Sequence, residues 1–315
     1  MRSRARRGCI WLMSSLLAFG ASSPARQAPK ATEDVRVTAA DTGRPGGRLV
    51  ASLHSDPKSL NPVTALDAYS KEVISLLFAD LIHTNPYTQH TETALAKSWK
   101  ASSDGKRYTL ELRRGVRFSD GNPFDADDVV FSFKVYLDEK VHSPQRDLLE
   151  VGGKPIQVRK IGPYEVEFEL PEPYAAAERL FDSVRILPRH LLERAYEEGK
   201  ISQVWEMATN PGEIAGLGAF RLKQYVPGQQ IVVERNPFYW KVDPSGNRLP
   251  YLDEIAFLIV PTEDAEVIRF QAGDIDVISR MAPTTMTHSS GISVQEPISS
   301  TIWGRDSNTT SSSLT

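Results

Sequence analysis

Alternation of apolar and polar residues predicts several short strands between about residues 46 and 280. In segment 108–112, Tyr108, Leu110 and Leu112 alternate with polar residues, as in a strand with one buried face. Residues 164–170 repeat the pattern, with three glutamates on the second face. Further strands are predicted at 48–52, 220–225, 230–234, 255–260 and 275–278. The run 255–260 is apolar throughout, which favours burial on both faces.

Helical spacing appears in other segments. Residues 70–81 carry one apolar face, made of Val73, Ile74, Leu77, Phe78 and Leu81. Residues 187–196 and 263–271 are also predicted as helices, and Pro227–Gly228 is predicted as the turn between two strands. The mixture indicates an α/β or α+β fold rather than a β-sandwich or a helical bundle.

Composition narrows the class of protein. The 315 residues include 37 Lys+Arg and 40 Asp+Glu, giving a net charge of −3, and the mean hydropathy is −0.33. These values argue against a polytopic membrane protein and against a nucleic-acid binder, which would carry a basic excess. Cys9 is the one cysteine, so neither an intrachain disulfide nor a cysteine-rich metal cluster can form.

The first 20 residues have the layout of an export signal. Four arginines precede a short apolar run from Cys9 to Phe19, and small residues follow from Gly20. The run is too short to span a hydrocarbon core about 30 Å thick, so a cleaved signal is favoured over an anchor. Residues 1–20 are therefore predicted to be a signal peptide, and the product to be periplasmic or otherwise extracytoplasmic.

Two segments lack a hydrophobic period. Residues 21–45 are interpreted as a flexible leader, and residues 282–315 as a Ser/Thr-rich tail. Neither can bury enough apolar surface to offset the entropy of ordering, so the tail is predicted to be disordered unless it results from a frameshift.

The search for catalytic and cofactor motifs is largely negative. The chain has no G-x-S-x-G, H-E-x-x-H or G-x-x-x-x-G-K-[ST] sequence. Gly216-Leu217-Gly218 begins like a dinucleotide fingerprint, but the third glycine is missing and a predicted strand follows. His83 and His90 make a poor metal site, and solvated loop histidines are the favoured interpretation. Five aromatic residues could line the floor of a ligand site, but each is expected more often to pack in the core or at its edge. They are Trp99, Trp205, Phe238, Tyr239 and Trp240.

The acid-rich segment 120–128 has two interpretations. It suggests a calcium loop, but an EF-hand loop needs glycine sixth and glutamate twelfth, whereas here glycine is second and proline fourth. A turn followed by a helix explains the acids better. Asp125 suits the N-cap, and Asp127 and Asp128 lie where the helix dipole favours negative charge.

A family resemblance connects these segments. Gly46–Val50 followed by Pro57–Pro62 resembles the first strand and loop of the peptide/nickel class of solute-binding proteins, the extracytoplasmic receptors of ABC importers. The strongest match follows the family's usual order: Ala96–Trp99, Asp104–Gly105, Tyr108–Phe118, Asp120–Phe124 and Ala126–Val129. Arg107 departs from the usual small or β-branched residue. Later blocks are Gly216–Phe220, Glu234–Trp240, Tyr251–Asp253 and Gly273–Asp276. The resemblance runs from about residue 46 to 280.

The resemblance implies a bilobal receptor with a type II periplasmic-binding-protein-like fold, built from mixed sheets with flanking helices. Residues 46–270 would be the first lobe and 271–281 the start of the second. Lobes of such proteins close on a ligand through a hinge and dock on a membrane permease. The implied partners are a short peptide and an ABC permease, with no nucleic acid, and the implied state is a monomer without catalytic residues, cofactor or metal.

The family also suggests where ligand would bind. The loop after Asn61-Pro62 faces the cleft in these proteins, so the ligand-binding candidates are Leu66, Asp67, Ala68 and Tyr69. Asp67 either pairs with a ligand amine or caps the following helix.

Length is the main departure from the family. Family members run through a complete second lobe and return to the first, whereas recognisable sequence here stops near Arg280. Three explanations compete for this length. The gene is frameshifted or mis-assembled, the chain is a natural remnant, or the short chain works alone or with a partner chain. The first two explanations together are preferred over the third. We expect a truncated form, with its second lobe largely missing and its peptide binding impaired.

Two other functions stay open. A nickel or metal-chelate receptor of the same class is the first, and the sparse histidines argue mildly against it. An exported hydrolase with a dispersed active site is the second, and it would need a nucleophile–base pair that the sequence does not reveal.

Overall fold

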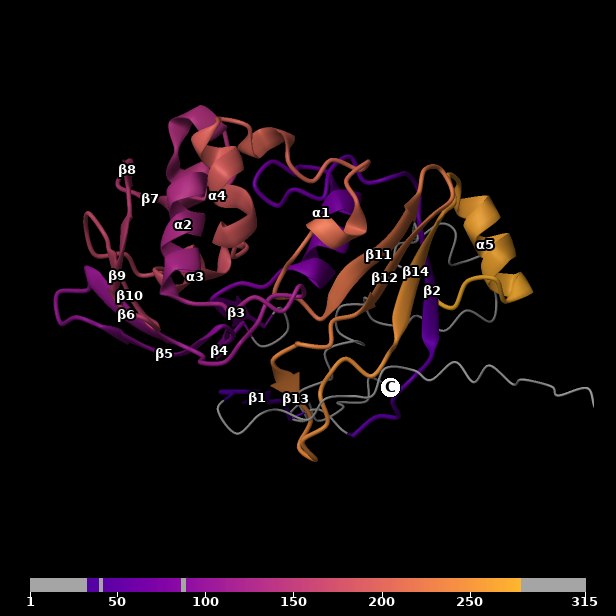
Figure 1. The fold of residues 1–315 in the computed structure, drawn as a ribbon, viewed down its shortest axis with the longest axis horizontal. Coiled ribbons are helices and arrows are strands. Elements are labelled where there is room, and N and C mark those ends of the chain that lie inside the picture. The colour runs from indigo at the N-terminus through magenta and orange to yellow at the C-terminus, as the bar shows by residue number, and fades with distance from the viewer. Residues whose placement is uncertain (1–32, 40–41, 86–88, 279–315) are drawn as a thin grey trace, which may run out of the picture.

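The computed structural model describes residues 33–39, 42–85 and 89–278, and arranges them in two bodies, each built on a four-stranded sheet (Figure 1). The strand order is β11-β12-β14-β2 in the first sheet and β5-β6-β10-β9 in the second. Helices flank both sheets, so the predicted α/β class is confirmed.

The first body has a mixed sheet. Its strands are β2 (Arg48–Leu53), β11 (Phe220–Val226), β12 (Gln230–Arg235) and β14 (Glu254–Ile259). β11, β12 and β14 run antiparallel, while β14 and β2 are parallel. Helix α1 (Ala68–Leu77) lies beside β11, and α5 (Glu263–Ala272) lies beyond β2 on the other side of the sheet (Figure 1).

The second body has an antiparallel sheet with one buried face. Its strands are β5 (Ala96–Ala101), β6 (Arg107–Leu112), β9 (Gln157–Gly162) and β10 (Glu165–Glu169). Leu110, Leu112 and Val166 are fully buried, which confirms the alternation predicted from the sequence. Helix α2 (Ala126–Leu137) packs on β9 and β10. Phe168 of β10 lies 4.9 Å from Phe133 of α2, measured between ring centroids.

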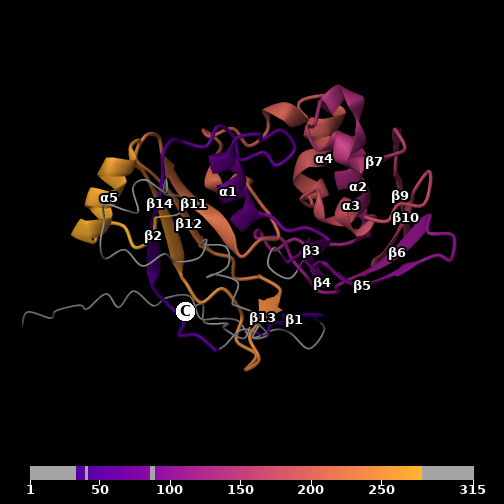
Figure 2. The same ribbon diagram turned by 180° about the vertical axis from the view of Figure 1, so that it is seen from behind.

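The smaller elements complete the two bodies, and Figure 2 shows them from behind. The remaining strands are β1 (Arg36–Val37), β3 (Ile82–Thr84), β4 (Thr91–Thr93), β7 (Glu150–Val151), β8 (Lys154–Pro155) and β13 (Lys241–Val242). The remaining helices are α3 (Glu178–Asp182), α4 (Arg189–Glu197) and the 3-10 turns Glu139–Val141, Arg146–Leu149, Ile201–Gln203 and Pro211–Glu213.

The acids of segment 120–128 build a turn and a helix start. Asp120 accepts a hydrogen bond from the Asn122 amide at 3.0 Å. Asp125 accepts from the Asp127 amide at 2.8 Å, and Asp128 accepts from the Asp125 amide at 3.0 Å, which forms a capping box on α2. The turn-and-cap interpretation is therefore confirmed.

Two glycines let the chain entering β11 touch the end of α1. The Gly218 amide donates to the Leu77 carbonyl at 2.9 Å. A Cβ at Gly218 would lie 2.2 Å from the Leu76 oxygen, and one at Gly216 would lie 2.0 Å from the Leu77 oxygen. Only glycine fits such close backbone contact. This Gly-Leu-Gly sequence is thus a packing motif that leads into a strand. A dinucleotide-binding fingerprint would lead into a helix, so the sequence-based argument against that fingerprint is confirmed.

Three expectations need correction. The helix predicted to reach residue 81 ends at Leu77, because Phe78 takes up extended backbone (φ −121°, ψ 164°). The strand predicted at 275–278 reduces to one parallel bridge between Ala51 and Val277. The predicted leader contains a short strand, since the Arg36 amide donates to the Trp240 carbonyl and β1 pairs with β13.

Several predicted segments lie outside the described residues, namely the signal peptide, most of the leader and the tail 282–315. Within the described ranges, none of the helices combines the length and apolar character needed to cross a bilayer.

Candidate functional site

The four ligand-binding candidates lie together at the start of α1. Leu66 is 68% exposed and Ala68 is also exposed, whereas Asp67 and Tyr69 are half-buried. Asp67 is the N-cap of the helix: its Oδ1 accepts from the Ser70 amide at 2.8 Å and its Oδ2 from the Ser70 hydroxyl at 2.5 Å. The capping role proposed for Asp67 is therefore observed. Burial opposes its charge, but the bonds from Ser70 outweigh this and lower its pKa.

Hydrogen bonds from the second body and within the loop hold the loop that leads to this site. The Asn61 side chain donates to the Ile201 carbonyl at 2.8 Å and accepts from the Val63 amide at 2.9 Å. The Ser143 hydroxyl donates to the Val63 carbonyl at 2.8 Å. Because Asn61 and Val63 are buried, these bonds satisfy groups that would otherwise be costly to bury.

Tyr69 lies beside a polar cluster of Ser52, His54 and Glu266. Its ring lies 6.5 Å from that of His54, at the end of β2. His54 Nε2 lies 3.0 Å from a carboxylate oxygen of Glu266 on α5, and the Ser52 hydroxyl donates to the other oxygen. Glu266 is only 2% exposed and is the one buried residue of α5. A buried carboxylate needs such partners, so the cluster fixes α5 against β2.

The arrangement of this cluster bears on the hydrolase alternative. Glu266 lies between Ser52 and His54, so the serine hydroxyl is bonded to the carboxylate and not to the imidazole. In a serine triad the imidazole takes the proton from the hydroxyl, and the carboxylate orients the imidazole from its other nitrogen. These three residues therefore do not form a nucleophile–base pair. Sequence reasoning missed the cluster because Glu266 is more than 200 positions from its partners.

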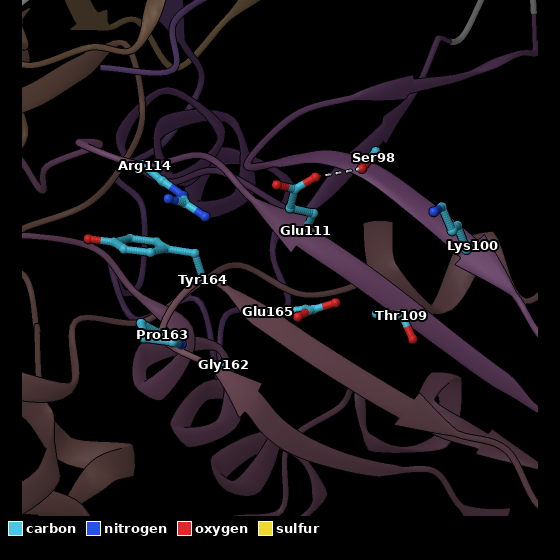
Figure 3. Close-up of a pocket in the computed structure, with 9 residues that line it drawn as sticks. All are labelled: Ser98, Lys100, Thr109, Glu111, Arg114, Gly162, Pro163, Tyr164 and Glu165. Atoms are coloured by element: carbon cyan, nitrogen blue, oxygen red, sulfur yellow. Dashed lines mark hydrogen bonds between the residues drawn. The ribbon is translucent and has the colours of Figure 1, made fainter. Parts of the chain in front are cut away.

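A shallow hollow of about 360 Å³ lies on the exposed face of the second sheet (Figure 3). Arg114 lies 5.7 Å from the Tyr164 ring, Ser98 donates to Glu111, and Lys100 and Glu165 also line it. Charges of both signs are mixed there. The hollow is on the other body from the four candidates and contains none of them.

The aromatic residues considered as a ligand floor mostly pack in the core. Trp205, Tyr239 and Trp240 are between 2% and 4% exposed. Trp99 is partly buried and donates from its indole to Glu178 at 2.8 Å. Core packing, the expectation from the sequence, is therefore confirmed for the first three.

Among the residues that the structure describes, one cluster has the donor groups to hold a metal ion. Asp80, His83 and Asp182 each bring a ligand atom to within 4.8 Å of the others. Of the two histidines interpreted as solvated loop residues, His83 lies beside an acid, since its Nδ1 is 3.8 Å from Asp80 Oδ2. Burial opposes the charge on Asp80, but Arg185 and His83 outweigh it and lower its pKa to about 2. Burial and the charge of Asp80 raise the pKa of Asp182.

Comparisons with known proteins place this architecture. The family described as bacterial extracellular solute-binding proteins, family 5 Middle, matches residues 90–306. The oligopeptide-binding protein AppA of Bacillus subtilis is 28% identical over 272 residues, covering 86% of this chain and 48% of AppA. The periplasmic alpha-galactoside-binding protein of Rhizobium meliloti is 34% identical over 203 residues, covering 62% of this chain and 29% of its own length.

A solved structure agrees with the sequence comparison. AppA from Bacillus subtilis in complex with a nonapeptide has a TM-score of 0.65 and 29% identity, covering 78% of this chain and 46% of that one. This likeness confirms the type II periplasmic-binding-protein fold. The chain spans about half the length, or less, of the relatives that it matches.

The family match also corrects one expectation and decides the class. It reaches residue 306, so the expectation that recognisable sequence stops near Arg280 is wrong. It covers well over half of the chain and agrees with the fold, and the chain therefore belongs to the bacterial extracellular solute-binding proteins of family 5.

Proposed function

We propose that this protein is the extracytoplasmic substrate-binding component of an ABC importer for short peptides, and that it is not an enzyme. The observation that carries the proposal is the likeness to AppA, a relative named for oligopeptide binding whose solved structure contains a nonapeptide. In this proposal the ligand is captured by lobe closure and delivered to a permease. Residues 46–270 form the first lobe, residues 271–281 begin the second, and the predicted signal peptide directs export of a monomer.

The geometry around α1 supports a ligand-facing role for Leu66, Asp67, Ala68 and Tyr69. These residues are exposed or half-buried, while the residues that precede them are buried and hydrogen-bonded. A fixed backbone with accessible side chains and main-chain groups suits an extended peptide, which binds largely through its own main chain. Fixing the loop beforehand lowers the entropy lost on binding.

Binding by this chain alone is proposed to be weak. In a hinged receptor both lobes contact the ligand, so the described lobe would supply only part of the contacts. We expect a dissociation constant above about 1 μM, so binding would contribute less than about 8 kcal/mol of free energy. A detection method that captures weak complexes is therefore needed.

Photo-crosslinking tests the proposal on the full chain. Short peptides carrying a photoreactive group are irradiated with the protein, and labelled residues are mapped by mass spectrometry. Labels should concentrate on residues 54–69, and unlabelled peptides should compete for them. Tyr69→Ala should lower labelling several-fold, whereas Tyr174→Ala, which removes a 42% exposed tyrosine of the second body, should not.

Other outcomes would replace the proposal. Peptide binding at this site would be contradicted if Tyr69→Ala left the labelling unchanged. It would also be contradicted if an α-galactoside or a nickel chelate, but no unlabelled peptide, reduced the labelling. The α-galactoside arm is included because one relative is named for that ligand. Release of product from a panel of chromogenic esters and peptides would instead favour the hydrolase.

A further inference from the structure

Two carboxylates and an imidazole meet where the turn after α1 contacts α3. Asp80 follows the end of α1, His83 lies on β3, and Asp182 is the last residue of α3, which packs against β3. Asp80 is 5% exposed and Asp182 is half-buried. Nearly 100 positions separate His83 from Asp182, so only the fold brings these three ligand types together.

Each carboxylate of this cluster also contacts a group outside it. Arg185 Nη1 lies 2.5 Å from Asp80 Oδ2 and compensates one carboxylate. Asp182 accepts a hydrogen bond from the neutral Thr84 amide at 3.0 Å. A divalent cation bound by both carboxylates would remove the repulsion between them.

The donor set selects among cations. One imidazole nitrogen and two carboxylate oxygens suit Zn²⁺, whereas Mg²⁺ and Ca²⁺ prefer oxygen ligands alone. Ligand atoms of one tetrahedral Zn²⁺ lie about 3.4 Å apart, given bond lengths of roughly 2.0–2.2 Å. The observed separations of up to 4.8 Å therefore close if each ligand atom moves by less than about 1 Å.

Access to the cluster is open on one side. The His83 side chain is 48% exposed, so an ion can enter past it and water can fill the remaining coordination position. Rotation of a half-exposed imidazole can also supply most of the movement that closure needs. From the donor set, the distances between the ligand atoms and this access, we propose that Asp80, His83 and Asp182 bind one Zn²⁺ ion per chain.

Such an ion would join three segments of the fold. It would tie the turn after α1 and strand β3 to the end of α3, and hence the first body to the second (Figure 2). An ion that binds only the folded form stabilises it in proportion to the logarithm of its concentration. The proposal is independent of peptide binding, because none of the residues 66–69 belongs to the cluster.

Titration calorimetry of the metal-stripped full chain with zinc chloride tests the proposal. The parent should show one saturable site, and an excess of Mg²⁺ should not displace the ion. His83→Ala should lower the affinity by roughly tenfold or more, as loss of a ligand costs at least as much as loss of an outer-shell partner. Asp182→Asn should do the same. His90→Ala, which removes the imidazole from the other side of the same hairpin, should leave the affinity unchanged.

Thermal unfolding provides the second readout. Zn²⁺ should raise the melting midpoint of the parent and of His90→Ala, but not that of His83→Ala. Because His83 is half-exposed, its loss should not prevent folding, so this comparison remains decisive if Asp182→Asn does not fold. Absence of a saturable site in the parent, or equal affinities for the parent and His83→Ala, would overturn the proposal.

Discussion

Replacing Asp67 by Ala is expected to destabilise the protein by about 2–3 kcal/mol. Loss of an N-cap side chain costs roughly 0.5–2 kcal/mol. The Ser70 hydroxyl is fully buried and donates to Asp67, so it would also lose its acceptor, at a cost of roughly 1–3 kcal/mol. The two effects share Ser70, which keeps the total below their sum. Asp67→Asn keeps one acceptor oxygen for the helix end but places its amide nitrogen opposite the second Ser70 donor, so it should cost about 1 kcal/mol less than Asp67→Ala.

Urea unfolding followed by far-UV circular dichroism measures both variants against the parent. The comparison also has a defined pH dependence. Because the folded-state pKa of Asp67 is lowered, its charge contributes stability that is present above the unfolded pKa of about 3.9. That contribution is lost as the pH falls through the lower, folded value, so the difference between the parent and Asp67→Asn should shrink there. Equal stabilities of the Ala and Asn variants at pH 7 would refute the capping argument.

The same pair of variants separates capping from ligand contact. Asp67→Asn removes the negative charge but preserves the helix start, so only a charge contact with a ligand amine would be lost. Since both carboxylate oxygens already accept from Ser70, we expect Asp67→Asn to keep peptide crosslinking near the parental level. A loss of crosslinking in this stable variant would assign the ligand amine to Asp67.

Two further substitutions test the packing of the two bodies. Gly218→Ala should cost about 3 kcal/mol or more, because its Cβ would lie 2.2 Å from the Leu76 oxygen, whereas Gly212→Ala, with 3.6 Å to its nearest neighbour, should change unfolding little. Equal urea midpoints for these glycine variants would contradict the close-contact argument. Phe168→Ala should cost about 3–5 kcal/mol, since the ring is fully buried against Phe133 and Phe181. Phe168→Leu, which keeps most of the volume, should cost clearly less, and comparable losses would show that the cavity does not dominate.

The spacing of apolar residues predicted most helices and strands, because the buried side chains recur at the period of the element. Strands β6 and β10 each bury one alternating face, and the capping box of α2 joins residues three positions apart. Such signals lie within one segment of the chain. The end of α1 escaped prediction for the opposite reason, since Leu81 is buried by tertiary contacts after the helix has ended.

The candidate site could be only partly predicted. The resemblance selected Leu66 to Tyr69, and the structure places them together at one helix start. The residues that support them gave no local signal, because Glu266 reaches His54 across more than 200 positions. His83 and Asp182 likewise meet only through the packing of β3 on α3. Pairings of this kind depend on topology, which short-range periodicity in a single sequence does not reveal.

Hydrogen bonds connect the candidate ligand-facing segment, residues 66–69, to both bodies. From the second body, the Trp205 and Ile201 carbonyls accept hydrogen bonds from Leu60 and Asn61. From the first, the Ser70 hydroxyl accepts from the Lys58 and Ser59 amides while it donates to Asp67. Rotation of one body against the other would therefore have to break bonds on one side of the loop or carry the start of α1 with it. The position of residues 66–69 is thus fixed by hydrogen bonds to both bodies at once.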